Sequence, residues 1–274
     1  MTMGGGILRE APVLRSMLER TSHRLVFRRR LPAPFATARI YASTEGGLRY
    51  LRPRASGIDP PLLGLAAELI RPGDTVWDIG ANLGLFTFAA AAAAGPDGEV
   101  LAVEPDVHLV SLLRRSAVAN PDVAPVNVLG TAVSDEVGVA RFHVARRNRS
   151  TNYLDGFGTG QAGGSRAVQT VPTVTLDWLA ERFPLPRVIK IDVEEAEVLA
   201  LRGAEQVLQH GAIVICEVAG TNADAVRDLL RPHGYELYDA DLAPARRVPV
   251  SAAPPSTLAV HPSRPASAPV ARVG

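Results

Sequence analysis

The sequence predicts an α/β protein with a doubly wound, Rossmann-type sheet that is mostly parallel. From residue 62 onward, short continuous apolar stretches alternate with stretches of helical periodicity. Continuous apolar strands are typical of a parallel sheet whose two faces are both covered by helices. The glycine-rich turn at residues 78–84 also ends a strand and begins a helix. Doubly wound folds place such a turn at the carboxyl edge of the sheet, where they bind ligands.

Turn signals separate the predicted elements along the chain. Pro72-Gly73 lies between the first helix and the first strand of the alternation, and Gly95-Pro96 ends the second helix, because glycine and proline interrupt regular structure. Val- and Thr-rich alternation at 169–176 predicts a strand that pairs in the antiparallel direction. The predicted helices are 62–69, 85–94, 107–119, 177–183, 194–209 and 222–230. The predicted strands are 38–41, 75–79, 99–103, 126–129, 139–144, 169–176, 187–191, 212–218, 235–238 and 257–260.

These elements place one domain at residues 58–261, between a basic N-terminal extension (1–57) and a tail (262–274) that we expect to be disordered. Residues 4–31 carry seven Arg against two Glu and contain a predicted amphipathic helix. That helix either packs on its own domain or contacts a membrane or partner. Residues 146–166 are rich in glycine and lack periodicity, so we expect a loop insertion that acts as a lid. On closure, Arg146, Arg147 and Arg149 would meet the carboxylates of Glu194, Glu195 or Glu197.

Composition excludes several classes of protein. Hydrophobic residues make up 47% and charged residues 21%, which excludes disorder of the whole chain. A net charge of +1 gives no general attraction to nucleic acid. The single cysteine, Cys216, cannot form an internal disulfide, and we expect a cytoplasmic protein. The longest apolar run, residues 85–95, is about half the roughly 20 residues that a membrane span needs, so we expect no transmembrane segment.

The turn that includes Asp78, Gly80, Asn82 and Gly84 is the first candidate for cofactor binding. Its glycines allow the backbone to approach a ligand, and the following helix offers free N–H groups. A dinucleotide would bring a pyrophosphate against the carboxylate of Asp78, whereas S-adenosylmethionine carries a cationic sulfonium and amino group. The turn therefore favours S-adenosylmethionine over NAD. The alternative for Asp78 is a purely structural role in capping the helix.

Glu104 ends the second strand, about 20 residues after the turn, where a carboxylate can accept both hydroxyls of an adenosine ribose. Ser134 and Asp135 follow the third strand, near the expected position of the adenine ring. Asp135 could bind the exocyclic amine, or it could simply form the turn before Gly138.

A second group of chemically active residues lies around the fourth parallel strand. Asp192 ends that strand, Lys190 shares its face, and Glu194 and Glu197 begin the next helix three residues apart. Glu217 ends the fifth strand at the same edge. These carboxylates could accept a substrate proton, bind a hydroxyl or amino group, or hold a divalent cation, and capping of the helix is the structural alternative. Lys190 is the only lysine in a chain with 28 arginines, which suggests that an ammonium is needed there.

The order of these motifs resembles the FkbM family of S-adenosylmethionine-dependent methyltransferases. The resemblance covers about residues 71–260. It rests on the segments Asp78-Ile79-Gly80-Ala81-Asn82-Leu83-Gly84, Glu104-Pro105, Ala132-Val133-Ser134-Asp135, Thr175-Leu176-Asp177, Ile189-Lys190-Ile191-Asp192-Val193-Glu194, Ala196-Glu197, Val198-Leu199, Gly203-Ala204 and Glu217.

The resemblance implies a class I methyltransferase sheet with an antiparallel last strand, here 257–260. It also implies O-methylation of a hydroxyl, often on a sugar or secondary metabolite. One residue departs from the family pattern, because Glu195 stands where the family has glycine. Added bulk and charge there would alter the acceptor or weaken activity.

The sequence therefore predicts an S-adenosylmethionine-dependent O-methyltransferase with a small-molecule acceptor and no nucleic-acid substrate. Asp192 is expected to orient or deprotonate the acceptor, with Lys190 and Glu194 beside it, and Glu197 and Glu217 are expected to contact the substrate. A divalent metal held by Asp192 and Glu217 is the less favoured mechanism. The alternative functions are a binding protein that kept the fold but lost catalysis, and, less favoured, an NAD-linked oxidoreductase.

Overall fold

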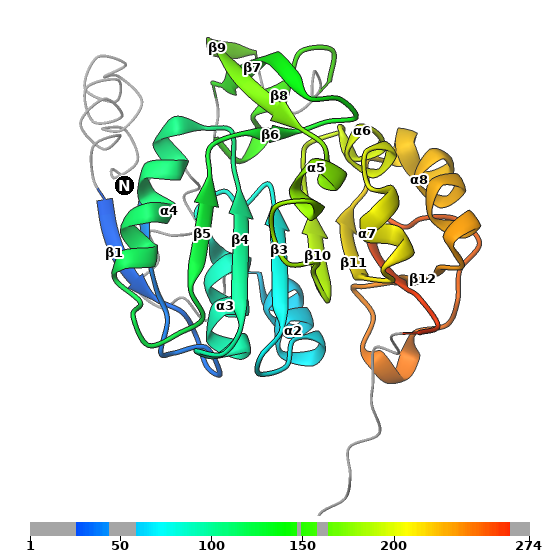
Figure 1. The fold of residues 1–274 in the computed structure, drawn as a ribbon, viewed down its shortest axis with the longest axis horizontal. Helices are drawn as coiled ribbons and strands as arrows, with labels where there is room; N and C mark the ends of the chain where they lie inside the picture. The colour runs from blue at the N-terminus through cyan, green and yellow to red at the C-terminus, as the bar shows by residue number, and fades with distance from the viewer. Residues whose placement is uncertain (1–25, 44–58, 147–148, 158–163, 264–274) are drawn as a thin grey trace, which may run out of the picture.

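The computed structural model describes residues 26–43, 59–146, 149–157 and 164–263. Its centre is a seven-stranded sheet with the order β12-β13-β11-β10-β3-β4-β5 (Figure 1). Five neighbouring strands are parallel, and β13 is antiparallel to both β11 and β12. The predicted doubly wound sheet and its antiparallel last strand are therefore confirmed. The strands are β3 (Thr75–Ile79), β4 (Glu99–Val103), β5 (Val126–Leu129), β10 (Val188–Ile191), β11 (Ile213–Glu217), β12 (Glu236–Asp239) and β13 (Ser256–Val260).

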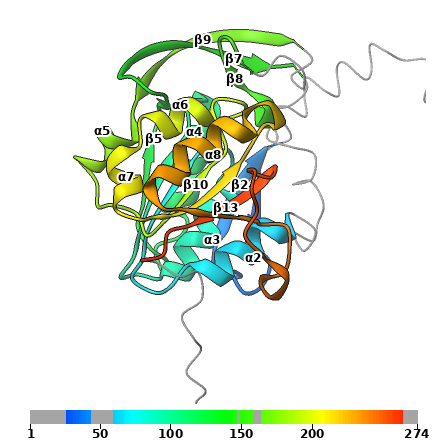
Figure 2. The same ribbon diagram turned by 90° about the vertical axis from the view of Figure 1, so that its right-hand side faces the viewer.

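Helices cover both faces of the sheet, as Figures 1 and 2 show. Alternate strand residues point to opposite faces, so Val76 packs in one apolar cluster and Trp77 in the other. The first cluster includes side chains of α2 (Pro60–Leu69), α3 (Leu85–Ala94) and α4 (Val107–Val118). The second includes side chains of α5 (Leu176–Ala180), α6 (Glu197–Arg202), α7 (Glu205–Gln209) and α8 (Ala223–Leu230). No helix of the described residues has the length and apolarity needed to cross a bilayer.

One predicted helix is wrong, because residues 197–202 form α6 and residues 205–209 form α7, and Glu194, which was expected to begin the helix, lies before α6 with a positive φ. The break falls at Gly203, which lies against the preceding α5 region. A Cβ atom on Gly203 would lie 2.9 Å from the carbonyl oxygen of Ser134 and 2.9 Å from Cβ of Thr175. Only a glycine fits in this contact, and the helix is interrupted there. Helical periodicity in the sequence does not reveal such a tertiary contact.

A second, four-stranded sheet lies above the carboxyl ends of the central strands (Figure 1). Its order is β6-β9-β7-β8, with β9 antiparallel to β7, which confirms the antiparallel pairing predicted for 169–176. The described part of the predicted loop insertion contains a 3-10 turn (Arg149–Thr151) and β8, whereas residues 147–148 and 158–163 lie outside the described residues. The strands are β6 (Ala132–Val133), β7 (Gly138–Ala145), β8 (Tyr153–Leu154) and β9 (Ser165–Val174).

Two N-terminal strands, β1 (Val26–Arg30) and β2 (Arg39–Ser43), form an antiparallel hairpin beside α4. Two side chains, Ser116 on α4 and Asn120 just after it, form hydrogen bonds with backbone groups of β2. The Arg39 N–H donates to Asn120 Oδ1 (2.8 Å), Asn120 Nδ2 donates to the Arg39 carbonyl (2.6 Å), and the Tyr41 N–H donates to Ser116 Oγ (2.8 Å). Ile40 and Ala42 are fully buried in the first apolar cluster. The predicted N-terminal amphipathic helix and residues 264–274 of the predicted tail lie outside the described residues.

Replacement of Asn120 by Ala is expected to lower the free energy of unfolding by about 2–3 kcal/mol, because two backbone groups of β2 lose buried partners. Chemical denaturation measures this loss. Asn127→Ala is the control, because Asn127 is exposed and donates to Glu99 at the surface, and a change within about 0.5 kcal/mol is expected. Equal effects of the two substitutions would show that Asn120 does not secure the hairpin.

Candidate functional site

A pocket with about 570 Å³ of open space lies at the carboxyl edge of the central sheet. It extends from the ends of β3, β4 and β10 to the small sheet, which supplies part of its wall. The lining residues are Ile79, Gly80, Asn82, Val103, Glu104, Pro105, Thr131, Ala132, Val133, Phe142, Arg149, Asn152, Tyr153, Leu154, Asp192, Val193 and Glu194.

The two glycines of the turn after β3 are required by close packing within the protein. Both have positive φ, +79° at Gly80 and +85° at Gly84. A Cβ atom on Gly80 would lie 1.8 Å from the carbonyl oxygen of Asp192, and one on Gly84 would lie 2.7 Å from side-chain atoms of Leu113 and Phe88. Gly80 therefore lets the loop after β10 lie against the turn, and it also lines the pocket.

A buried ion-pair cluster joins β3 to β10 beneath the pocket. Lys190 lies opposite Asp78 in the strand register, and its ammonium is 3.3 Å from Asp78 Oδ1, 3.1 Å from Asp192 Oδ2 and 3.3 Å from the Gly80 carbonyl. Burial alone lowers the pKa of Lys190, but the charges of Asp192 and Asp78 outweigh burial and raise the pKa above its usual range. Lys190 is therefore a fixed cation that holds Asp192, as strand alternation predicted. It is not suited to exchange a proton during a reaction.

Glu104 presents a buried carboxylate at the end of β4. It accepts the N–H groups of Asn82 (2.8 Å) and Asp106 (2.9 Å). Burial raises the pKa of Glu104 to about 7, although these two hydrogen bonds oppose the shift. Asn82 has φ +51°, and its side-chain oxygen is buried without a hydrogen-bond partner among the described residues. Two polar groups of the pocket are therefore prepared for a ligand that donates hydrogen bonds.

The loop after β10 brings several carboxylates together. Burial, followed by the charges of Asp192, Glu217 and Glu197, raises the pKa of Glu194 to about 8. The charge of Asp192 is also the largest cause of the raised pKa of Glu217, at the end of β11. Because these carboxylates repel one another, the loop favours bound protons or a cationic ligand.

Glu197 stabilises this loop from below. It is nearly fully buried, and burial raises its pKa. One carboxylate oxygen accepts the N–H of Glu195 (2.8 Å), and the other accepts Nδ2 of Asn222 (2.7 Å), which also donates to the Glu195 carbonyl (2.8 Å). The contact between Glu197 and substrate stays a prediction.

The pocket gathers five of the predicted site residues, namely Gly80, Asn82, Glu104, Asp192 and Glu194. Ser134 is buried beside the pocket, where its hydroxyl donates to the exposed Asp135 (3.2 Å). The described lining of the pocket does not include Asp78, Gly84, Ser134, Asp135, Lys190, Glu197 or Glu217.

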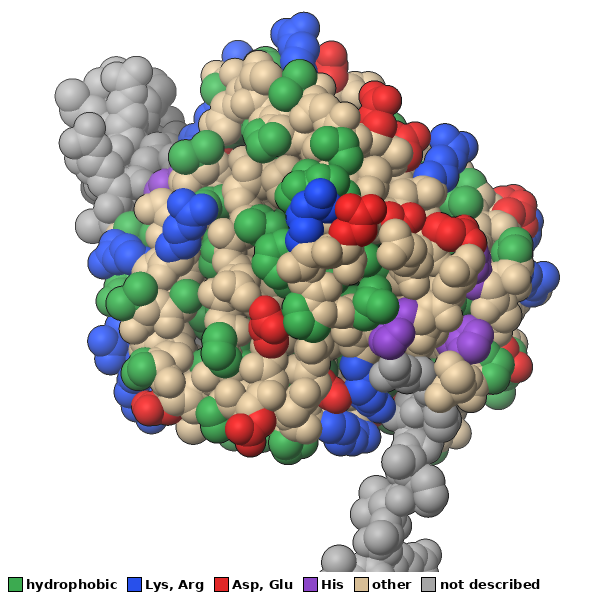
Figure 3. All heavy atoms as spheres, viewed as in Figure 1, with side chains coloured by type: hydrophobic (Ala, Val, Ile, Leu, Met, Phe, Trp, Pro, Cys, Tyr) green, Lys and Arg blue, Asp and Glu red, His purple; other side chains and the backbone are tan. Residues whose placement is uncertain are grey.

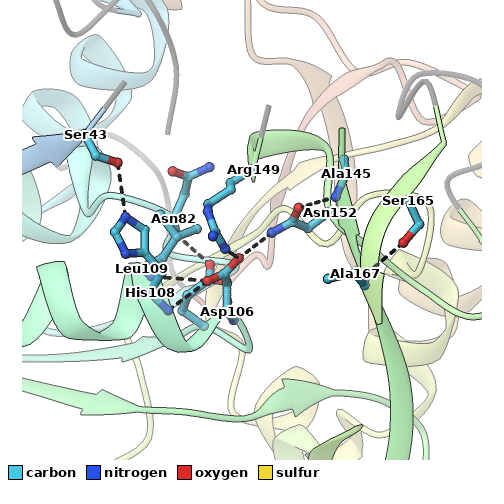
Figure 4. A network of polar contacts seen from close by, with 11 residues as sticks. Ser43, Asn82, Asp106, His108, Leu109, Ala145, Arg149, Asn152, Ser165 and Ala167 are labelled. Carbon is cyan, nitrogen blue, oxygen red and sulfur yellow. Dashed lines mark hydrogen bonds and ion pairs between the residues drawn. The ribbon is translucent and has the colours of Figure 1, made fainter. Parts of the chain in front are cut away.

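The segment that we predicted to act as a lid supplies part of the pocket wall, but the sequence did not single out which of its residues do so. Asn152 and Tyr153 lie in a segment that has no periodicity, so no pattern singled them out. Arg149 pairs with Asp106, which caps α4 by accepting the N–H groups of His108 and Leu109 (Figure 4). An Asp directly before a helix is a signal for an N-cap, but it does not reveal a partner 43 residues away.

Within the described parts of the chain, no group of three or more His, Cys, Asp or Glu side chains has the geometry of a metal site. The acidic groups instead lie around the ammonium of Lys190 or accept backbone and amide hydrogen bonds.

The strand order, with its reversal beside β3 and its antiparallel seventh strand, defines a class I methyltransferase fold with a pocket at the carboxyl edge. The Methyltransferase FkbM domain matches residues 78–237, which is more than half of the chain. The chain therefore belongs to the FkbM methyltransferase family, and the resemblance recognised from its motifs is confirmed.

Two relatives are similar over 61% of this chain. The 31-O-demethyl-FK506 methyltransferase FkbM of Streptomyces tacrolimicus is 30% identical over 203 residues, which cover 75% of that protein. The hexuronic acid methyltransferase AglP of Haloferax volcanii is 29% identical over 171 residues, which cover 65% of that protein. Among solved structures, a precorrin-6y C5,15-methyltransferase from Geobacter metallireducens GS-15 is 12% identical, with a TM-score of 0.41, over 73% of this chain and 86% of that one.

Glu195, where the resemblance to the family led us to expect glycine, has φ +73°, a conformation that glycine adopts without strain. Glu195→Gly is therefore expected to raise the free energy of unfolding by about 0.5–1 kcal/mol, because relief of the left-handed backbone exceeds the entropy cost of glycine. Thermal or chemical denaturation measures the change. Glu195→Ala is the matched control, since it removes the charge but keeps the Cβ atom. An equal gain in both variants would identify charge repulsion, not the backbone, as the cause.

Proposed function

We propose that the protein transfers a methyl group from S-adenosylmethionine to a hydroxyl group of a small molecule. The observation that carries this proposal is a single pocket that contains Glu104 after β4 together with Asp192 and Glu194 after β10. Strand β3 lies between β4 and β10 in the sheet, so these carboxylates flank the end of β3. A cofactor bound beside Glu104 and an acceptor bound beside Asp192 and Glu194 would therefore meet at the end of β3.

The chemistry of the pocket fits S-adenosylmethionine better than NAD. Glu104 can accept the ribose hydroxyls, and the unpaired oxygen of Asn82 can accept a further donor. A pyrophosphate would instead face Glu104, Asp192 and Glu194, and like charges in a partly buried site repel strongly. S-adenosylmethionine, when bound, supplies a methyl group on a positively charged sulfonium.

Asp192 and Glu194 are suited to different parts of the reaction. Asp192 is held in place by Lys190, so it can orient an acceptor hydroxyl. Glu194 has a pKa of about 8, and a general base is most effective when its pKa is near the working pH. In this mechanism Glu194 accepts the proton of the acceptor hydroxyl, while Lys190 keeps the charge of Asp192 balanced.

A small hydroxylated acceptor is also supported by the relatives. One is named for an O-demethyl form of FK506, and the other for hexuronic acid. On the face of the molecule seen in Figure 3, basic and acidic side chains are interspersed, with several basic ones along the left edge, the side on which β1 lies in Figure 1. Release of S-adenosylhomocysteine with a panel of sugars and other hydroxylated metabolites tests the proposal. Binding of S-adenosylmethionine without turnover on any acceptor would favour the alternative of a non-catalytic binding protein.

The affinity for S-adenosylmethionine is expected to rise with pH between about 5.5 and 7.5. Burial raises the pKa of Glu104 to about 7, and ribose hydroxyls donate to the ionised carboxylate, so binding below that pH must first remove a proton. Below pH 7 the dependence should approach tenfold per pH unit. Calorimetric titrations of the wild type and Glu104→Gln measure it. The variant should bind weakly and without this dependence, and an unchanged affinity in a folded variant would remove Glu104 from the site.

Asp192→Asn is expected to lower kcat by about 10²-fold or more while the affinity for the cofactor changes little, because an oriented carboxylate acts mainly on the acceptor in the transition state. Steady-state kinetics and calorimetry on the same preparation separate the two effects. Asp97→Asn is the control at an exposed position between α3 and β4. Equal losses in cofactor affinity and turnover would place Asp192 in the cofactor site, and activity that is lost on chelation would favour the metal mechanism.

A further inference from the structure

Asp106 joins two distant parts of the chain. It follows Glu104 by two residues, is fully buried, and caps α4 through the N–H groups of His108 and Leu109. Its second carboxylate oxygen accepts hydrogen bonds from Arg149 and from Nδ2 of Asn152 (2.8 Å) (Figure 4). A carboxylate with this many donors is firmly held, and removal of one donor would leave a buried charge poorly compensated.

Asn152 connects Asp106 to the small sheet. Its side-chain oxygen accepts the N–H of Ala145 at the end of β7 (2.9 Å), while its side-chain nitrogen donates to Asp106 (Figure 4). Tyr153 and Leu154, the next residues, pair with β7 as strand β8. The single amide of Asn152 therefore fixes the edge of the small sheet to the loop that follows β4.

These contacts form part of the wall of the pocket. Arg149, Asn152 and Tyr153 line the same space as Glu104. The backbone N–H of Asp106 also donates to Glu104 (2.9 Å). The residue that secures the wall is thus hydrogen-bonded to the carboxylate that is positioned for the ribose.

We propose that Asn152 and Arg149 are positioning residues that retain the cofactor by fixing the small-sheet wall of the pocket to Asp106. This inference rests on the proposed function, because it takes S-adenosylmethionine and its product as the ligands. In this proposal, ligand exchange at the Glu104 side requires the wall to separate from Asp106, which breaks the ion pair with Arg149 and the hydrogen bond from Asn152. Dissociation of the cofactor is therefore slow relative to a site whose wall is held by apolar contacts alone.

The experiment measures dissociation rates of S-adenosylmethionine and S-adenosylhomocysteine from the full chain by stopped-flow displacement. Asn152→Asp keeps the acceptor for the Ala145 N–H but replaces the donor to Asp106 with a second carboxylate. Dissociation is expected to be about tenfold faster in this variant. Asn127→Asp makes the same change opposite Glu99 at the exposed amino edge of the sheet, and its rates should equal those of the wild type.

Two further variants distinguish retention of the cofactor by Asn152 from a general effect on protein stability. Asp106→Asn combined with Asn152→Asp restores the hydrogen bond between the two side chains, and an Asn still caps a helix, but the ion pair with Arg149 is lost. Dissociation should therefore slow only part of the way back to the wild-type rate. Asn120→Ala is a second comparison, because it is expected to destabilise the hairpin without touching the pocket and should leave the dissociation rates unchanged. If Asn152→Asp does not fold, Asn152→Ala replaces it with the same expected direction.

Each outcome identifies which proposal fails. A wild-type chain that does not bind S-adenosylmethionine refutes the proposed function. A wild type that binds it, with the same dissociation rates in both Asn152 variants, refutes only the retaining role of Asn152. Rates that rise equally in Asn120→Ala would show that loss of stability, not the wall of the pocket, controls release.

Discussion

The buried ammonium of Lys190 is the interaction on which the rest of the site depends. It lies between Asp78 on β3 and Asp192 after β10, and it also donates to the carbonyl of Gly80. Without this cation, two carboxylates and a carbonyl would converge in a region of low dielectric, which is strongly unfavourable. The glycine turn and the acidic loop are therefore one interlocked structure, because the Asp192 carbonyl occupies the space that a side chain at Gly80 would need.

The loop after β10, which contains Glu194 and Glu195, combines strained backbone with crowded carboxylates beside Lys190. Glu194 and Glu195 both have positive φ. Burial and the neighbouring carboxylates raise the pKa of Glu194, and the charge of Asp192 together with burial raises the pKa of Glu217. Strained backbone persists only when the surrounding structure holds it, and here Glu197 and Asn222 hydrogen-bond to the backbone of Glu195. Binding of a cation or a hydrogen-bond donor would reduce the repulsion between these carboxylates. The loop therefore lowers the stability of the free protein and favours binding of such a ligand.

Much of the fold could be predicted from the sequence, because parallel strands leave continuous apolar runs and glycines mark the turns between elements. The pairing of Lys190 with Asp192 also followed from simple strand alternation. The break between α6 and α7 could not be predicted, since it depends on the contact of Gly203 with Ser134. The partnership of Asp106 with Asn152 was equally hidden, because it joins an N-cap to a segment without periodicity 46 residues later.

The attachment of the β1–β2 hairpin to α4 affects how the chain folds during synthesis. The partners of Arg39 and Tyr41 lie 81 and 75 residues further along the chain. At a translation rate of about 5–20 residues per second, β2 leaves the ribosome roughly 4–16 seconds before the segment that completes its edge. During that interval the backbone groups of Arg39 and Tyr41 lack their partners Asn120 and Ser116, so the hairpin completes its docking as a late step.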